Sequence, residues 1–205
     1  PHAFFPSRPD QWYAHALAPM LQVYSEMGWA ASLEQQDVWL DGKKMAGSGA
    51  ASIGVAGVVG TSFLLKFPVA EFTQQIAAPS VGFRQWLGDA LEEAITSWSD
   101  HAAMPDLDWL SLVYRRAAAS IYGWRWEQAL LRDDERAARE EYRAELIPEH
   151  DTQTKLVPHG IKINAQRFLT EQNFDGRWVR ILTQGHTVAR IALSHLPQLS
   201  EHCLI

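Results

Sequence analysis

Two adjacent lysines follow a turn signal, and one of them could place a positive charge inside the protein. Residues 36–50 read QDVWLDGKKMAGSGA: an apolar run, the turn pair Asp41-Gly42, Lys43 and Lys44, and then small residues. Alternation along a strand sends the two lysines to opposite faces, so one can face solvent while the other faces inward. Small residues after Lys44 leave room for a ligand and let backbone N–H groups approach anionic oxygens. The open alternative is a hairpin with two exposed lysines, whose glycines serve only the bends.

Other well-known catalytic patterns are missing from the sequence. It contains no GxxxxGK[ST] phosphate loop and no GxGxxG, HExxH or GxSxG motif. The eight histidines are scattered, so we do not expect a metal site built from them. The single cysteine, Cys203, lies two residues from the C-terminus. One cysteine excludes a disulfide framework and a CxxC site, and we expect no catalytic role for it.

The lysine stretch resembles the lysine motif of the lipoate–protein ligase A family, within the biotin/lipoate ligase superfamily. In that family an Asn-Asp pair precedes a hydrophobic strand, a glycine, a basic residue, the functional lysine, an apolar residue and Gly-Ser/Thr. The matching positions here are Gln36-Asp37, Val38-Trp39-Leu40, Gly42, Lys43, Lys44, Met45-Ala46 and Gly47-Ser48. The family's His-Gly-Thr-Leu strand corresponds to Val59-Gly60-Thr61, followed by Leu64-Leu65. The likeness is loose over most of the chain, and its discriminating part is residues 36–65.

This resemblance implies an ATP-dependent ligase that joins lipoate or octanoate to AMP and passes the acyl group to a carrier protein. Lys44 would be the catalytic residue, because a fixed ammonium offsets the repulsion between the carboxylate and the α-phosphate. The same comparison implies that the cofactor-binding residues are Lys44, Asp37, Gly47, Ser48, Gly60 and Thr61. Among these, Gly60 and Thr61 would line the acyl pocket. Asp37 would contact the nucleotide or Mg²⁺, and the alternative for it is a hairpin-edge carboxylate.

The sequence departs from the family pattern at three places, and one of these departures predicts a partner chain. The family's first motif, Arg-Arg-x-Gly-Gly-Gly ending near His-Asp, is absent, Gln36 replaces Asn and Val59 replaces His. That motif should hold the nucleotide and the lipoyl tail, so we expect a second chain or segment that carries it. A two-subunit ligase, a fragment, and a descendant that only binds lipoyl-AMP all stay open. The substrate protein would be a lipoyl domain or a glycine-cleavage H-like protein.

Two related activities fit the sequence less well. An octanoyltransferase of this fold uses a cysteine nucleophile, and Cys203 is misplaced for that task. A biotin ligase would show a Lys-x-Pro-Asn approach to the strand, which is missing.

The apolar spacing predicts an α+β fold, which the resemblance specifies as a biotin/lipoate ligase-like, mainly antiparallel sheet with flanking helices. Helices are expected at 10–27 (kinked or split at Pro19), 83–98, 107–122 (capped by Asp106 or Asp108) and 133–146. Strands are expected at 29–33, 37–40, 44–50, 55–67, 161–168, 177–183 and 186–193, with a loop at 148–158. A boundary at Gly123-Trp124 would separate residues 1–123, the larger C-terminal part of the catalytic core, from a small α+β accessory domain at 124–205.

Composition limits the remaining function classes. The chain has 205 residues, of which 47% are hydrophobic, so it is long and apolar enough to bury a core. Eighteen Lys and Arg against 24 Asp and Glu give a net charge of −6, which argues against nucleic acid as a partner. The uncharged run from Met45 to Leu65 is rich in glycine and hydroxyl residues, so it favours buried strands over a membrane span. The start of the chain lacks a signal-peptide pattern, and we expect a cytoplasmic protein.

Overall fold

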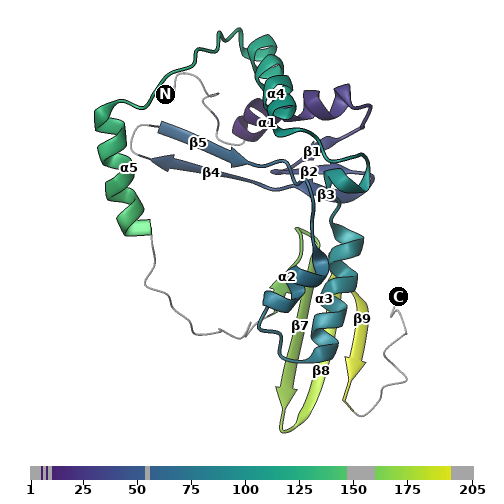
Figure 1. Ribbon diagram of the computed structural model, residues 1–205. Coiled ribbons are helices and arrows are strands. Elements are labelled where there is room, and N and C mark those ends of the chain that lie inside the picture. Colours follow the sequence, from purple (N-terminus) through teal and green to yellow (C-terminus); the bar gives the residue numbers. More distant parts are fainter. Residues whose placement is uncertain (1–5, 7, 9–10, 54–55, 147–159, 195–205) are drawn as a thin grey trace.

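The computed structural model describes residues 6, 8, 11–53, 56–146 and 160–194; the predicted loop at 148–158 lies outside this part. Figure 1 shows an α+β arrangement of helices and antiparallel sheets. The helices are α1 (Trp12–Glu26), α2 (Val69–Gln75), α3 (Val81–Ala94), α4 (Leu107–Tyr122) and α5 (Asp133–Leu146), with a 3₁₀ turn at Trp98–Asp100. The strands are β1 (Ser32–Glu34), β2 (Asp37–Leu40), β3 (Lys43–Ala46), β4 (Ser48–Ile53), β5 (Ala56–Thr61), β6 (Ile161–Lys162), β7 (Arg167–Phe174), β8 (Arg177–Gln184) and β9 (Thr187–Leu193).

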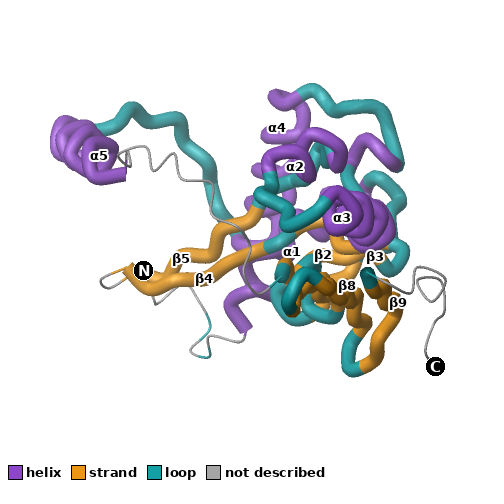
Figure 2. Tube along the Cα trace, turned by 90° about the horizontal axis from the view of Figure 1, so that it is seen from below, coloured by secondary structure: helices purple, strands orange, loops and turns teal. Residues whose placement is uncertain are grey.

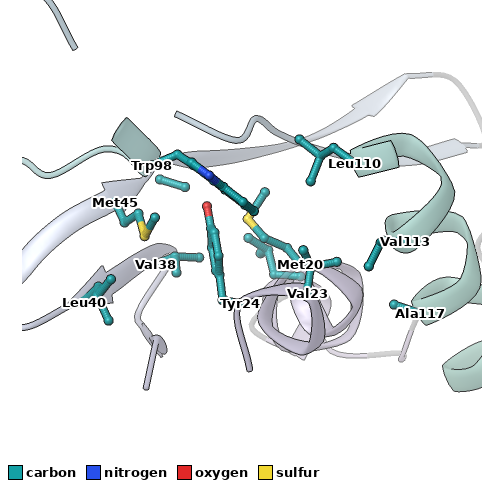
Figure 3. Packing of buried hydrophobic residues seen from close by; sticks show 12 residues of the cluster. Met20, Val23, Tyr24, Val38, Leu40, Met45, Trp98, Leu110, Val113 and Ala117 are labelled. Atoms are coloured by element: carbon teal, nitrogen blue, oxygen red, sulfur yellow. The ribbon is translucent and has the colours of Figure 1, made fainter. Parts of the chain in front are cut away.

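The first half of the chain builds a core from α1, α4 and the antiparallel sheet β1-β2-β3. Figure 3 shows side chains from these elements meeting around Tyr24 and Trp98. Tyr24, Val38 and Met45 are fully buried there. Burial of each such side chain contributes roughly 1.5–3 kcal/mol. This core holds the β2–β3 hairpin, and with it Lys44, in a fixed place.

A second core forms between α3 and the sheet β6-β7-β8-β9. Phe83 and Leu87 of α3 pack in one cluster with Leu169 and Leu182 of the sheet. Helix α3 precedes the predicted boundary at Gly123, and the sheet follows it, so the two sides of that boundary share a core. The exact division into residues 1–123 and 124–205 stays a prediction.

Strands β4 and β5 form a separate two-stranded ribbon. It contacts α1 and extends away from the β1-β2-β3 sheet, and α5 lies apart from both cores (Figures 1 and 2). Residues 49–52 are exposed at four consecutive positions, so neither face of β4 is covered along this stretch.

Local signals set several of the element boundaries. Asp106 caps α4 by accepting a hydrogen bond from the Trp109 N–H at 2.9 Å, and the helix ends at Gly123 with φ +67°. The Asp41-Gly42 turn has φ values of +50° and +75°, as a two-residue hairpin turn requires. These predictions, and the bounds of β2, α4 and α5, are confirmed.

Other expectations were wrong. The predicted split at Pro19 is wrong, because α1 continues through this residue, whose missing N–H removes the helical donor to the His15 carbonyl; a kink at Pro19 stays a prediction. The Tyr122 hydroxyl donates a hydrogen bond to that carbonyl from α4, which explains how the helix tolerates the proline. The predicted strand 44–50 is divided at Gly47 into β3 and β4. The predicted strand 161–168 breaks because Asn164 Oδ1 accepts from the N–H groups of residues 166 and 167 and bends the chain.

Helix α2 and the 169–174 part of β7 were not predicted. The predicted strand 29–33 begins only at Ser32, and the predicted strand 55–67 ends at Thr61.

Candidate functional site

The Lys44 ammonium is held in an ion pair within the β2–β3 hairpin. Its Nζ lies 2.8 Å from Oδ2 of Asp37, the first residue of β2. The Asp37 side chain is 11% exposed and the Lys44 side chain 26% exposed, so the pair is partly shielded from water. The hairpin register brings them near each other, because Lys44 pairs with Trp39, which is two residues after Asp37 on β2. The cation is therefore positioned by the fold and does not extend freely into solvent.

Gly47 lies directly against this ion pair. A Cβ atom at Gly47 would lie 3.3 Å from both Cε and Nζ of Lys44 and 3.7 Å from Oδ1 of Asp37. These first two distances are tighter than ordinary packing contacts, so a side chain at position 47 would press on the ammonium. The glycine allows the backbone to approach the charge closely.

The remaining predicted residues surround Gly47. The Thr61 hydroxyl donates to the Gly47 carbonyl at 3.1 Å, and Ser48 pairs with Thr61 across the ribbon. The Ser48 hydroxyl donates to the carbonyl of Gln36, next to Asp37. Gly60 is one position further, opposite Gly49, with no atom within 4 Å of a Cβ built on it. The structure thus brings Asp37, Lys44, Gly47, Ser48 and Thr61 into one connected group, while their functional roles stay predictions.

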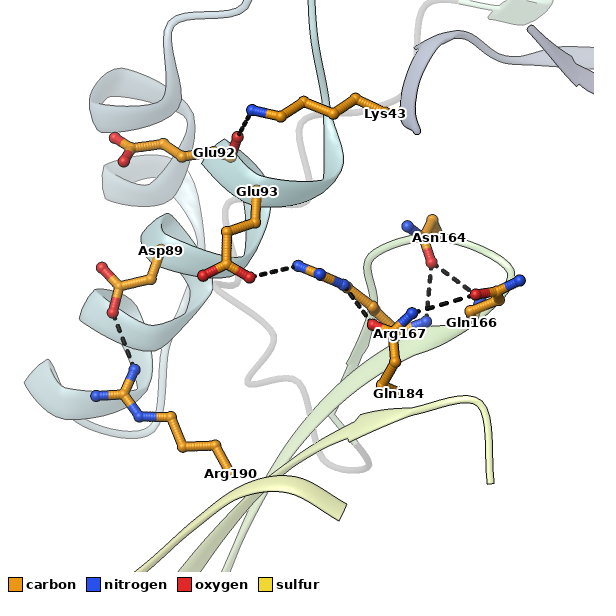
Figure 4. A network of polar contacts seen from close by, with 9 residues as sticks. All are labelled: Lys43, Asp89, Glu92, Glu93, Asn164, Gln166, Arg167, Gln184 and Arg190. Carbon is orange, nitrogen blue, oxygen red and sulfur yellow. Dashed lines mark hydrogen bonds and ion pairs between the residues drawn. The ribbon is translucent and has the colours of Figure 1, made fainter. Parts of the chain in front are cut away.

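Lys43 points away from the ion pair, as strand alternation predicts. Its Nζ donates to the carbonyl of Glu92 at 2.7 Å, in the last turn of α3 (Figure 4). A cation at a helix C-terminus compensates the carbonyls that lack an intrahelical donor. Lys43 therefore connects the hairpin to α3, whereas Lys44 forms the ion pair with Asp37.

The strand carrying Lys44 is also joined to the chain that leaves α3. The carbonyl of Lys44 accepts a hydrogen bond from the Thr96 N–H at 3.0 Å, next to a parallel bridge between Lys44 and Ile95. The backbone of β3 at Lys44 is consequently held on both sides, by β2 and by the chain that follows α3.

A pocket of about 370 Å³ lies where α1, residues 61–63 and α4 meet. Its lining residues are Met20, Thr61, Ser62, Phe63, Leu107, Leu110, Ser111 and Tyr114. Burial raises the pKa of the Tyr114 hydroxyl above its ordinary value, so it is uncharged at neutral pH. Thr61 is the predicted site residue that lines this pocket, and the sequence analysis missed the others. The spacing of 107, 110, 111 and 114 on one helix face was the available signal.

Three further expectations concern a metal site, a membrane span and the single cysteine. Within the described residues, no group of three or more His, Cys, Asp or Glu side chains could hold a metal ion. No helix in that part of the chain is long and apolar enough to span a bilayer. Cys203 lies outside the described residues.

One solved protein structure has a fold similar to that of this chain. A solved chain from Thermoplasma acidophilum superimposes on 68% of this chain with a TM-score of 0.60 and 15% sequence identity. It comes from an archaeal lipoylation system that comprises a bipartite lipoate protein ligase and its E2 lipoyl domain. The two chains share a fold. The likeness covers 56% of the Thermoplasma chain, so the present chain spans little more than half of that protein. No family model and no curated protein sequence matches the chain.

The comparison agrees with the fold class expected from the sequence. The structure is α+β, with antiparallel sheets and flanking helices, as in a lipoate ligase-like fold. At 15% identity the match shows a shared fold. A shared fold does not determine the chemistry, which depends on the residues of the site.

Proposed function

We propose that this chain is the larger part of a lipoate–protein ligase. The enzyme would activate lipoate or octanoate with ATP to an acyl-AMP and transfer the acyl group to a lysine of a lipoyl-carrier protein. The observation that carries this proposal is the Lys44 ammonium, fixed 2.8 Å from Asp37 beside the backbone of Gly47. The fold shared with the Thermoplasma chain supports it.

The chemistry follows from the donors of one ammonium group. In the first step a carboxylate oxygen attacks the α-phosphorus of ATP, a new O–P bond forms, and pyrophosphate leaves with the electrons of the broken bond. The two reacting groups are both anionic and repel each other. A lysine ammonium has three N–H donors; Asp37 accepts one, and two are left for one oxygen of each reactant. Lys44 then reduces the repulsion and stabilises the charge that develops at the phosphorus.

Asp37 fits the task of holding Lys44 better than that of binding a metal ion. One of its oxygens already accepts from the ammonium, whose positive charge opposes a dication at the same place. Mg²⁺ sites usually combine one or two carboxylates with the phosphates of the substrate. Mg²⁺ therefore enters this proposal as the companion of ATP, and we assign Asp37 the role of positioning residue.

The partners in the proposal follow the Thermoplasma system, which is bipartite and acts together with an E2 lipoyl domain. We propose a second chain or segment that carries the glycine-rich motif, and a lipoyl domain or H-like protein as acceptor. Because ATP is the expected co-substrate, we also expect a cytoplasmic location. The alternative is a non-catalytic subunit that binds lipoyl-AMP, which Val59 at the usual histidine position favours.

The neighbouring lysines provide the test and its control. Lys44→Ala removes up to two charge-assisted hydrogen bonds of about 1.5–3 kcal/mol each, so we expect acyl-AMP formation to fall by roughly 10²-fold or more. Lys43→Ala removes the same charge one residue away and should leave the rate within about threefold, because the Lys43 ammonium donates to a carbonyl of α3 and points away from Lys44.

The assay follows lipoyl-AMP by mass spectrometry in a mixture of the chain, the glycine-rich segment, lipoate, ATP and Mg²⁺. Full activity in Lys44→Ala would refute the proposed function. Binding of lipoyl-AMP by calorimetry without any turnover, even with the glycine-rich segment present, would establish the binding-only alternative.

A further inference from the structure

The segment that joins α4 to α5 exposes large apolar side chains. Within residues 124–131, the exposed apolar residues are Trp124, Trp126, Leu130 and Leu131. Leu130 is 87% exposed, although leucine is among the residues that most often lie in a protein core. The segment has no regular secondary structure and connects α4 to the separate helix α5 (Figure 1). Exposed apolar side chains that gather in one place mark surfaces that bind another protein.

The first part of this segment is held against α4. The Trp126 indole N–H donates to the Arg115 carbonyl at 2.8 Å, and the rings of Tyr122 and Trp124 lie 4.5 Å apart. The rings of Trp124 and Trp126 lie 5.5 Å apart and are nearly perpendicular. The two indoles are therefore ordered before a partner binds, which lowers the entropic cost of association.

The elements on either side of the segment carry opposite charges. The second half of α4 presents Arg115 and Arg116, which are exposed and form no ion pair within the described residues. Helix α5 has six acidic residues against three arginines, and Glu141 is likewise without an ion pair in the part of the chain that the structure describes. Along residues 107–146 the surface thus changes from basic to apolar to acidic.

Helix α5 does not pack on its own molecule. It lies apart from both cores, and each of its side chains that the structure describes is exposed, except the half-buried Ala138 (Figure 2). A helix of 14 residues is only marginally stable in water without tertiary packing. Ala138, Glu141 and Tyr142 share one face at helical spacing. Helix α5 therefore offers a partner a short apolar strip beside the Glu141 carboxylate.

We propose that residues 107–146 form a self-association surface, whose partner is the same segment of a second copy of this chain. In a two-fold dimer each contact occurs twice with the partners exchanged. An antiparallel pairing places the two apolar segments 124–131 against each other at the axis. The acidic α5 of each copy then lies along the basic half of α4 of the other copy. A second copy therefore matches this surface both in apolar character and in charge. The inference does not depend on the proposed function.

The first test removes the apolar contact. Leu130→Asp places a charge on a side chain that the monomer leaves exposed. Val81→Asp is the matched control, because Val81 is exposed in the first turn of α3, where an aspartate suits the helix N-terminus. Sedimentation velocity of the whole chain over a range of concentrations measures the dissociation constant of the dimer. We expect a monomer–dimer equilibrium in the unmodified chain and in Val81→Asp, and a dissociation constant raised at least about tenfold in Leu130→Asp.

The second test exchanges charges. Arg116→Glu and Glu141→Arg should each weaken the dimer, because each places like charges across the interface. The double variant restores opposite charges and should return to within about threefold of the unmodified chain. Arg177→Glu is the control for net charge, since Arg177 is exposed at the start of β8 and should leave the dissociation constant unchanged.

Several outcomes would overturn the proposal. A chain that stays monomeric at every concentration would do so, as would equal dissociation constants in Leu130→Asp and Val81→Asp. Single charge variants that weaken the dimer without recovery in the double variant would refute the pairing of α4 with α5. If the chain is monomeric and binds a glycine-rich partner segment through a contact that only Leu130→Asp removes, the surface belongs to that partner and the second copy is refuted.

Discussion

Replacing Gly82 by alanine would destabilise this protein, although alanine is the better helix former. Gly82 is the second residue of α3, and a Cβ atom there would lie 2.7 Å from Cζ of Arg180. At that distance either the helix or the guanidinium has to move. The size of the effect depends on how firmly Arg180 is held.

Arg180 of β8 is buried and has several partners. Its Nε lies 2.7 Å from Oε2 of Glu171, and both side chains are 7% exposed. Its Nη2 donates to the Ser80 hydroxyl at 3.0 Å, and Ser80 also caps α3. The guanidinium lies 5.1 Å from the ring of Trp86 and 4.8 Å from that of Trp178. A methyl group at position 82 would displace a buried charge from all of these contacts.

The loss of the Arg180 ion pair and the gain in helix propensity change the free energy of unfolding in opposite directions. Separating one partner of a buried ion pair costs about 3–5 kcal/mol, while Gly→Ala in a helix contributes up to about 1 kcal/mol. The free energy of unfolding of Gly82→Ala should therefore fall by about 2–4 kcal/mol. With a urea dependence of about 2 kcal/mol per M, the midpoint of unfolding should fall by about 1–2 M.

Urea denaturation followed by circular dichroism tests this estimate. Gly88→Ala on the same helix is the control, since its Cβ would meet only Val69 Cγ1 at 3.9 Å, an ordinary contact, and the variant should be more stable by up to about 1 kcal/mol. In an Arg180→Met background the effect of Gly82→Ala should change sign and become stabilising. Equal stability of Gly82→Ala and the unmodified chain would show that Arg180 moves aside freely, and would refute the claim that its contacts hold it in place.

Three further predictions concern buried hydroxyls, pH and a helix cap. Tyr24→Phe should be neutral or stabilising by up to about 1 kcal/mol in urea titrations, since the buried Tyr24 hydroxyl has no hydrogen-bond partner among the described residues. Tyr122→Phe should cost about 0.5–1.5 kcal/mol, because it removes the hydrogen bond to the His15 carbonyl. Burial, with the nearby Tyr114, raises the pKa of Tyr122 to about 12. The unfolded chain therefore ionises first, and thermal scans at rising pH should show stability intact below about pH 10 and lost progressively toward pH 12. Asp106→Ala should cost about 1 kcal/mol in the same denaturation assay, and Asp108→Ala, which keeps the cap, about half of that or less.

Elements with local signals were predictable from the sequence. Helix α4 begins after a capping aspartate and ends at a glycine in the left-handed region, and both signals lie within the helix itself or beside it. The β2–β3 hairpin is set by the Asp41-Gly42 turn in the same way. Such features depend on neighbouring residues, so one sequence is sufficient to find them.

Features that depend on distant residues were not predictable. Pro19 should interrupt α1, and it is tolerated because the Tyr122 hydroxyl reaches the His15 carbonyl from another helix. The seven-residue helix α2 has too few positions to show a clear period, and its place depends on packing against α3. The packing of α3 on the C-terminal sheet joins segments on both sides of the predicted boundary, which no local pattern reveals.

The candidate site has one part that depends on neighbouring residues and one that depends on distant residues. Its charged part lies within residues 36–61, where strand alternation and the resemblance to the ligase lysine motif predict Lys44 and Asp37 as site residues, and the structure places them 2.8 Å apart. The pocket needs α1 and α4, which approach the ribbon only when the first core forms. The charged part of the site therefore follows from local sequence, whereas the pocket follows from packing between elements that are far apart in the chain.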